Sequence, residues 1–302
     1  MKVGLQIIRF DWSNDMRDIR DRLTDTAKLA DESGFYSLWV MDHFFQMGDE
    51  FGPADAPMLE GYSTINYLAA ITARVRLGIL VTGNSYRNPG LLIKMVSTLD
   101  VLSGGRAYLG IGAGWYGREA RGLGLPLPDV KERFERLEET LQIAKHMWSG
   151  QRTSILGRYY QLQEPINCPQ PLQQPHPPIL IGGEGEKRTL RLVAQYGDAC
   201  NLYAGGKASE YSEGVKSIRS KLAILQKHCD SIGRPYRDIE LTALAGVDLT
   251  PTTTAVSNAM RLCESLAELG VQHVIFNIPN PHEFKQFESF AKKIIPAVAK
   301  VF

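Results

Sequence analysis

The chain has 302 residues, 44% of them hydrophobic and 22% charged, with a net charge of +1. This composition predicts a globular protein with a substantial core. The 34 basic and 33 acidic residues are interspersed, so we expect neither a nucleic-acid partner nor a membrane partner.

The first residues predict where in the cell the protein lies, and the cysteines predict the state of its thiols. Met1 and Lys2 lead directly into an apolar run without a signal-peptide pattern, which predicts a cytoplasmic protein. Four cysteines lie about thirty residues apart, with no CxxC pair and no histidine at ligand spacing. We therefore expect reduced thiols, with neither a disulfide framework nor a metal site.

Strand-like and helix-like segments alternate from the start of the chain. Short apolar runs predict strands, and amphipathic stretches predict helices. In the first part, the predicted strands are residues 3–8, 36–41, 76–82 and 107–111, the predicted helices are 15–33, 62–73 and 89–103, and a long loop covers 42–60.

The alternation of strands and helices is interrupted after the fourth predicted strand and then resumes. A segment rich in glycine and proline, 112–128, precedes a long amphipathic helix at 130–148. Residues 153–162 predict a small hairpin, and 165–178 form a proline-rich connection. The remaining strands are predicted from 179 and at 198–203, 239–246 and 273–278, with helices from about 190 and at 208–232, 255–269 and 282–301.

Eight strands alternating with helices predict an α/β fold, a (β/α)8 TIM barrel with insertions after strands two and four and before strand five. No linker divides the chain, so we expect one domain over residues 1–302. The alternative is a doubly wound sheet, which would carry its glycine fingerprint in the first turn after a strand. That turn, residues 9–14, contains no glycine.

The turn after strand five is rich in glycine instead. Gly182, Gly183 and Gly185 follow the apolar run at the point where a helical pattern begins. Backbone N–H groups at the start of a helix favour a phosphate. The alternative is a glycine-rich turn that serves tight packing alone.

Active sites of such barrels lie where the strands end. Strand two ends in Asp42 and His43. His43 can exchange a proton near neutral pH, and Asp42 could fix its tautomer or orientation. The alternative is that His43 only caps the loop or packs beside Phe44 and Phe45.

Strand four ends in a segment suited to a flat ligand. Gly112 and Gly114 would allow close approach to the backbone, and Trp115 and Tyr116 could stack on an aromatic ring. The strand ends offer no serine nucleophile elbow, no metal triad and no pair of carboxylates. A bound redox cofactor would supply the missing chemistry.

From Val3 to about Tyr203 the chain resembles the luciferase-like monooxygenase superfamily of flavin and deazaflavin oxidoreductases, especially its coenzyme F420-dependent branch. The match fades after Tyr203. The segments that carry the resemblance are Gly34-Phe35, Trp39-Val40-Met41-Asp42-His43-Phe44, Arg76-Leu77-Gly78, Val81-Thr82-Gly83, Tyr86-Arg87-Asn88-Pro89, Thr98-Leu99-Asp100-Val101-Leu102-Ser103-Gly104-Gly105-Arg106, Gly110-Ile111-Gly112-Ala113-Gly114-Trp115-Tyr116, Glu132-Arg133-Phe134-Glu135-Arg136-Leu137-Glu138-Glu139 and Pro178-Ile179-Leu180-Ile181-Gly182-Gly183.

This resemblance implies an oxidoreductase that transfers a hydride between F420 and an unsaturated or carbonyl small molecule, with His43 and Asp42 near the reactive ring carbon. It also implies a non-proline cis peptide at Ile79-Leu80. Thr82 is expected to hydrogen-bond the ring. The residues implied to bind the cofactor are Ile79, Leu80, Thr82, Gly112, Tyr116, Gly182, Gly183, Glu184 and Gly185.

One departure from the family pattern concerns the substrate. Sugar-phosphate dehydrogenases of this family carry a glutamate after the strand-four Gly-x-Gly, where this chain has Ala113, and a tryptophan after the strand-two motif, where it has Met47. A sugar phosphate is therefore not the expected substrate. Glu60 and Glu119 are the nearby carboxylic acids that could act instead.

Two other functions stay open at this stage. The first is an FMN-dependent monooxygenase or reductase on the same barrel, which would need a flavin reductase partner to supply reduced flavin. The second is a barrel that binds a flavin without catalysis. A homodimer is compatible with the sequence, which carries no readable code for oligomeric state.

Overall fold

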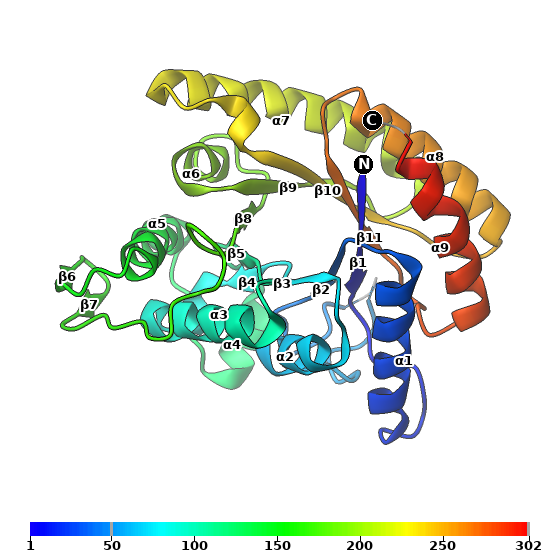
Figure 1. Ribbon diagram of the computed structural model, residues 1–302, viewed down its shortest axis with the longest axis horizontal. Coiled ribbons are helices and arrows are strands. Elements are labelled where there is room, and N and C mark those ends of the chain that lie inside the picture. The colour runs from blue at the N-terminus through cyan, green and yellow to red at the C-terminus, as the bar shows by residue number, and fades with distance from the viewer. Residues whose placement is uncertain (49–50, 301–302) are drawn as a thin grey trace.

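The computed structural model describes residues 1–48 and 51–300. Parallel strands form a barrel surrounded by helices (Figure 1), which confirms the predicted fold class. The strands of the barrel sheet are β1 (Lys2–Ile7), β2 (Ser37–Val40), β3 (Arg76–Ile79), β4 (Thr82–Gly83), β5 (Leu109–Gly112), β8 (Ile179–Gly182), β9 (Ala199–Gly205), β10 (Glu240–Gly246) and β11 (His273–Asn277).

The helices follow the strands as predicted, with one addition. They are α1 (Asp18–Ser33), α2 (Gly61–Ile71), α3 (Pro89–Ser103), α4 (Gly117–Leu123), α5 (Val130–Trp148), α6 (Thr189–Tyr196), α7 (Tyr211–Ile232), α8 (Thr252–Ala267) and α9 (Phe284–Val298). The sequence did not predict α4, which lies in the glycine- and proline-rich segment. Residues 49–50 of the predicted loop and residue 301 of the last predicted helix lie outside the described residues.

The barrel closes across a strand that is divided in two. β3 pairs with β2, and β4 pairs with β5 on the other side. Between them the Leu80-Val81 peptide is cis, so the predicted cis bond at Ile79-Leu80 was placed one residue too early. Ile79 still pairs with Val40, and the Leu80 N–H donates to the Val40 carbonyl. The regular ladder therefore continues through Leu80 and breaks after it.

Two layers of apolar side chains hold the barrel. One lies between the sheet and the helices. The other fills the barrel interior and includes Trp39, Tyr108, Leu180 and Ile275. Gly78 makes room for Trp39, because a Cβ atom there would overlap the indole ring.

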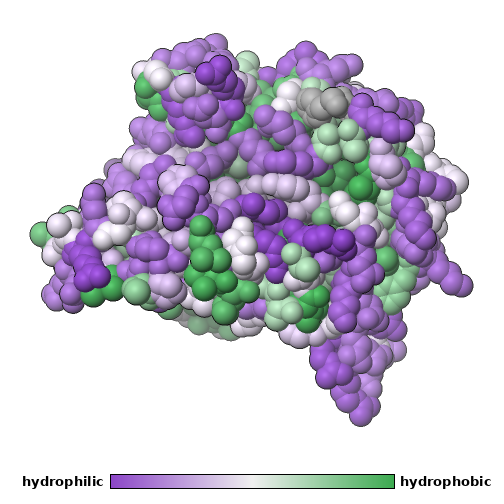
Figure 2. Space-filling view, viewed as in Figure 1, coloured by the Kyte–Doolittle hydropathy of each residue, from purple (hydrophilic) through white to green (hydrophobic). Residues whose placement is uncertain are grey.

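The rest of the chain packs around this barrel. The predicted hairpin is confirmed as the antiparallel pair β6 (Ile155–Leu156) and β7 (Gln161–Leu162), which projects from the barrel beside α5 (Figure 1). The face shown in Figure 2 is mainly hydrophilic, with hydrophobic residues in separate groups. Within residues 1–48 and 51–300, no helix combines the length and apolar character needed to cross a membrane.

Candidate active site

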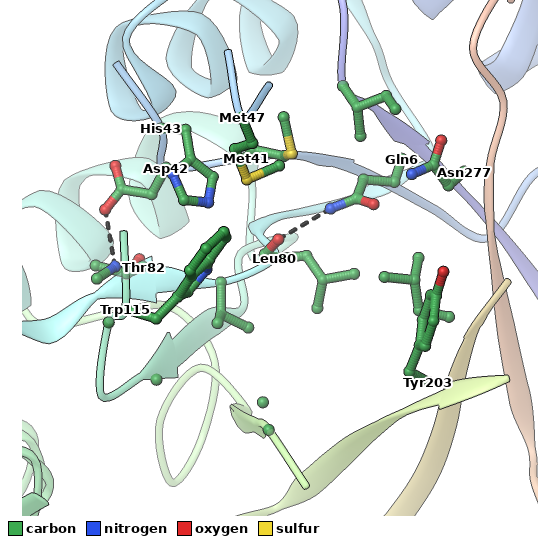
Figure 3. A pocket seen from close by; sticks show the side chains of 18 of the residues that line it. Gln6, Met41, Asp42, His43, Met47, Leu80, Thr82, Trp115, Tyr203 and Asn277 are labelled. Atoms are coloured by element: carbon green, nitrogen blue, oxygen red, sulfur yellow. Dashed lines mark hydrogen bonds between the residues drawn. The ribbon is translucent and has the colours of Figure 1, made fainter. Parts of the chain in front are cut away.

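A pocket of about 860 Å³ opens at the carboxyl ends of the barrel strands. Figure 3 shows His43 and Trp115 on one side of it, with Tyr203 and Asn277 opposite. Nine of the predicted site residues contribute to its lining: Asp42, His43, Leu80, Thr82, Gly112, Gly182, Gly183, Glu184 and Gly185.

Two predicted cofactor residues do not contribute to this lining. Ile79 is buried in the layer between sheet and helices, because side chains alternate between the two faces of a strand. Tyr116 donates from its hydroxyl to the Gln46 carbonyl at 3.1 Å. Its ring stands against those of His43 and Trp115, so Tyr116 supports the wall from behind.

His43 is held from one side by a residue that the sequence did not single out strongly. Its Nδ1 lies 2.7 Å from Oε1 of Glu119, which belongs to α4. Tyr86 donates its hydroxyl to the same oxygen at 2.6 Å. The Trp115 ring packs nearly perpendicular to the imidazole.

The second oxygen of Glu119 fixes the loop that carries His43. Oε2 accepts from the backbone N–H groups of Phe44 at 2.7 Å and Phe45 at 3.3 Å. Burial would raise the pKa of the Glu119 carboxyl, but its hydrogen bonds with His43 and Tyr86 outweigh it and keep that pKa below its ordinary value. Glu119 is therefore a buried carboxylate at neutral pH.

Asp42 has a different partner from the one proposed on sequence grounds. Its carboxylate makes a two-pronged ion pair with Arg87, at 2.7 and 2.8 Å, and accepts from the Gly83 N–H at 3.0 Å. Burial raises the pKa of the Asp42 carboxyl, and the Arg87 guanidinium opposes that shift. Arg87 also pairs with Glu60. Asp42 thus fixes the backbone around β4, and Glu119 is the residue that holds His43.

The floor of the pocket is the divided strand. Gln6 donates from its side-chain amide to the Leu80 carbonyl at 2.9 Å (Figure 3). The Thr82 hydroxyl lies 2.8 Å from that of Tyr62, which is fully buried. These contacts fix the Leu80 carbonyl and the Thr82 side chain at the floor of the pocket.

The Val81 side chain is the reason that two of the predicted site positions, 112 and 182, are glycines. A Cβ atom on Gly182 would lie 2.7 Å from one methyl group of Val81, and a Cβ atom on Gly112 would lie 2.9 Å from the other. Both distances are shorter than a carbon–carbon contact allows. Gly112, which was expected to let a ligand approach the backbone, lines the pocket and also makes room for Val81.

The glycine-rich turn after β8 lines the other end of the pocket. Gly183 has φ of 118°, which a side chain would disfavour. A Cβ atom on Gly185 would lie 2.9 Å from Oγ1 of Thr189 at the start of α6. Glu184 accepts from the Tyr203 N–H at 2.9 Å and pairs with Lys221 at 3.0 Å, which ties the turn to β9 and α7.

The described part of the chain contains no cluster of three or more histidine, cysteine, aspartate or glutamate side chains that could hold a metal ion.

Residues 2–294 match the family model described as luciferase-like monooxygenase. The chain belongs to this family. It is 32% identical over 223 residues to a protein of Kineococcus radiotolerans named F420-dependent glucose-6-phosphate dehydrogenase. That alignment covers 73% of this chain and 62% of the relative, so the chain spans less than two thirds of the length of that relative.

Solved structures share the fold at low sequence identity. The F420-dependent tetrahydromethanopterin reductase of Methanopyrus kandleri superposes with a TM-score of 0.75 at 16% identity, covering 98% of this chain and 99% of that one. A long-chain alkane monooxygenase superposes with a TM-score of 0.77 at 14% identity, covering 99% and 92%. Both therefore share the barrel architecture with this chain.

Proposed function

We propose that this family member is a coenzyme F420-dependent oxidoreductase that moves a hydride between the deazaflavin ring and a small organic substrate, with His43 exchanging the accompanying proton. The observation that carries the proposal is the position of His43. It lines a deep pocket whose other end is the glycine-rich turn after β8, and its Nδ1 is committed to Glu119.

The residues present fit such a cofactor. A volume of about 860 Å³ lies in the range of sites that enclose large organic ligands. Gly182, Gly183 and Gly185 line the pocket without side chains, so the backbone of the turn is left open to it. Backbone N–H groups in such a turn suit a phosphate, and the apolar floor at Leu80 and Val81 suits a planar ring.

The site residues would then have separate roles around the bound cofactor. When bound, the deazaflavin supplies the hydride chemistry. Thr82 would hydrogen-bond the ring, and the turn from Gly182 to Gly185 would hold the phosphate of the tail. His43 would take a proton from a substrate hydroxyl during oxidation and return it during reduction.

The lining favours an uncharged substrate over a phosphorylated sugar. The cations that line the pocket are two arginines, with no lysine among the described lining residues. Arg9 is paired with Asp11, and Arg133 donates to the Gly114 carbonyl. The wall near His43 is apolar and contains Met41, Met47 and Trp115 (Figure 3). We therefore expect an alcohol, a ketone or a conjugated alkene, although the Kineococcus relative is named for glucose 6-phosphate.

The proposal is tested by titrating the purified protein with F420 and with FMN, and by following the absorbance of each cofactor. We expect F420 to bind more tightly, and its reduced or oxidised form to be turned over with uncharged alcohols or ketones more efficiently than with glucose 6-phosphate. Preferential binding of FMN would contradict the F420 assignment.

The FMN alternative draws on the fold that this chain shares with the alkane monooxygenase. In that case a flavin reductase must be added before oxygen-dependent turnover is seen. If either cofactor binds but no donor or acceptor changes its redox state, the barrel is a binding protein and the catalytic proposal is wrong.

A further inference from the structure

We propose that Glu119 is a positioning residue that fixes the tautomer of His43, with the proton on Nδ1 and Nε2 left as the nitrogen that exchanges protons with the substrate. This inference rests on the proposed function for its catalytic meaning. The state of the imidazole itself can be measured without cofactor or substrate.

The hydrogen-bond pattern around Glu119 determines which atoms carry protons. Its side chain is 0% exposed, and both oxygens are occupied. The N–H groups of Phe44 and Phe45 can only donate, so Oε2 must accept. Burial and the neighbouring carboxylate raise the pKa of Tyr86, whose hydroxyl therefore keeps its proton and donates to Oε1.

With both oxygens accepting, Glu119 has no proton to offer to His43. The 2.7 Å contact is therefore a bond in which the imidazole Nδ1–H donates to Oε1. In the neutral ring, Nε2 then carries the lone pair. Within the described residues, Nε2 has no protein hydrogen-bond partner, and the side chain lines the pocket.

This arrangement suits one step of the proposed reaction. During oxidation of an alcohol, the C–H bond breaks and its electron pair leaves as hydride to the deazaflavin. The O–H bond breaks at the same time, its proton bonds to Nε2, and the C=O double bond forms. Glu119 lies against the imidazolium produced and stabilises its charge. The opposite tautomer would present an N–H to the alcohol and could not accept the proton.

The geometry also excludes the neighbouring acid from this role. Asp42 precedes His43 in the sequence, but both of its oxygens are engaged by Arg87 and Gly83. Glu119 is 76 residues further along the chain and reaches His43 because α4 lies against the loop that follows β2.

The decisive variant is Glu119→Gln, which keeps the shape of the side chain. The N–H groups of Phe44 and Phe45 require the amide oxygen at the Oε2 position, so the amide nitrogen must replace Oε1. That nitrogen has two protons, one for Tyr86 and one for Nδ1 of His43. Nδ1 then has to accept, which moves the ring proton to Nε2.

The tautomer is read from ¹⁵N NMR of the histidine-labelled protein without cofactor, at about pH 9, where an ordinary imidazole is neutral. The His43 signal is assigned with His43→Asn. We expect an Nδ1–H ring in the wild type and an Nε2–H ring in Glu119→Gln. An Nε2–H ring in the wild type, or an unchanged ring in the variant, would overturn the proposal.

Kinetics provide the second readout. Glu119→Gln should lower kcat about 10- to 1000-fold while the affinity for F420 changes less than threefold. Glu139→Gln is the matched control, because Glu139 also accepts backbone N–H groups, those of residues 158–160, and does not line the pocket. The control should keep the wild-type tautomer and kcat.

The two readouts separate the two proposals. A tautomer change in a protein that never turns over F420 would support the role of Glu119 and reject the proposed function. Wild-type kcat in Glu119→Gln, with F420 turned over normally, would reject the positioning role.

Discussion

At the scale of single residues, His43 is the side chain on which the proposed chemistry depends. Replacing it with alanine should leave F420 binding intact, because the turn after β8 is untouched, and should lower turnover by about 10² to 10⁴. Cofactor titration and steady-state kinetics measure the two effects.

The natural control for this substitution is His146→Ala, since His146 lies half-buried on α5, does not line the pocket and bonds to the Thr153 carbonyl. It should retain wild-type turnover. Normal turnover of His43→Ala would remove His43 from the mechanism.

The sequence allowed His43 to be found but not its partner. A histidine after a strand lies at the active end of a barrel wherever the strand assignment is correct. Glu119 was named as one of two nearby acids, yet nothing local to α4 shows that its side chain turns inward. Its contact with His43 depends on how a seven-residue helix packs, and pairings of this kind are not encoded by spacing along the chain.

At the scale of elements, Val81 fits between β5 and β8 because both strands end in glycine. Gly182→Ala should push Val81 toward the pocket, lower the free energy of unfolding by about 1–3 kcal/mol and weaken cofactor binding at least several-fold. Denaturant unfolding and titration with F420 measure the two effects.

A second substitution, at Val81, tests whether the clash causes the loss of stability. Because the clash is with the methyl groups of Val81, the double variant Val81→Ala with Gly182→Ala should recover much of the lost stability. A double variant no more stable than Gly182→Ala would show that the glycine is needed for another reason.

Helices were predicted accurately where the hydrophobic pattern agrees with the residues that begin and end helices. α3 and α5 begin and end at the predicted residues, the former between Pro89 and the Gly104 cap. α4 was missed because the glycines and prolines around it predict a loop. The family resemblance implied a cis peptide at Ile79-Leu80, whereas the structure has it at Leu80-Val81, just after the ladder between Val40 and Ile79.

At the scale of the whole molecule, the end of the barrel opposite the pocket contains a buried polar cluster. His273 is fully buried, with Nε2 2.8 Å from the Ser37 hydroxyl and Nδ1 3.8 Å from Glu240, which also pairs with Lys2. The rings of Tyr36 and Trp39 pack beside it. Burial lowers the pKa of His273 to about 4.

This cluster predicts how stability depends on pH. An unfolded histidine takes up a proton near pH 6.5, whereas the folded His273 stays neutral to about pH 4. Between these values the unfolded chain binds more protons, so the free energy of unfolding falls by up to about 1.4 kcal/mol for each unit that the pH is lowered. Urea unfolding from pH 7 to pH 5 measures the slope.

Substitutions show which histidine causes the free energy of unfolding to change with pH. His273→Gln should flatten the slope, and His146→Gln, on α5 and outside this cluster, should leave it unchanged. Burial also lowers the pKa of His282, so part of the slope should persist in His273→Gln. A wild-type protein equally stable at both pH values would contradict the prediction.

The two sides of the pocket come from different halves of the chain. His43, Tyr86 and Glu119 all lie within 43–119, while the opposite side is built by the ends of β9, β10 and β11, including Tyr203 and Asn277 (Figure 3). Recombination between family members at a crossover after α6 would therefore join the proposed acid–base residues to a different opposite wall. Such chimaeras would test whether selectivity can be changed while the proposed proton transfer is retained.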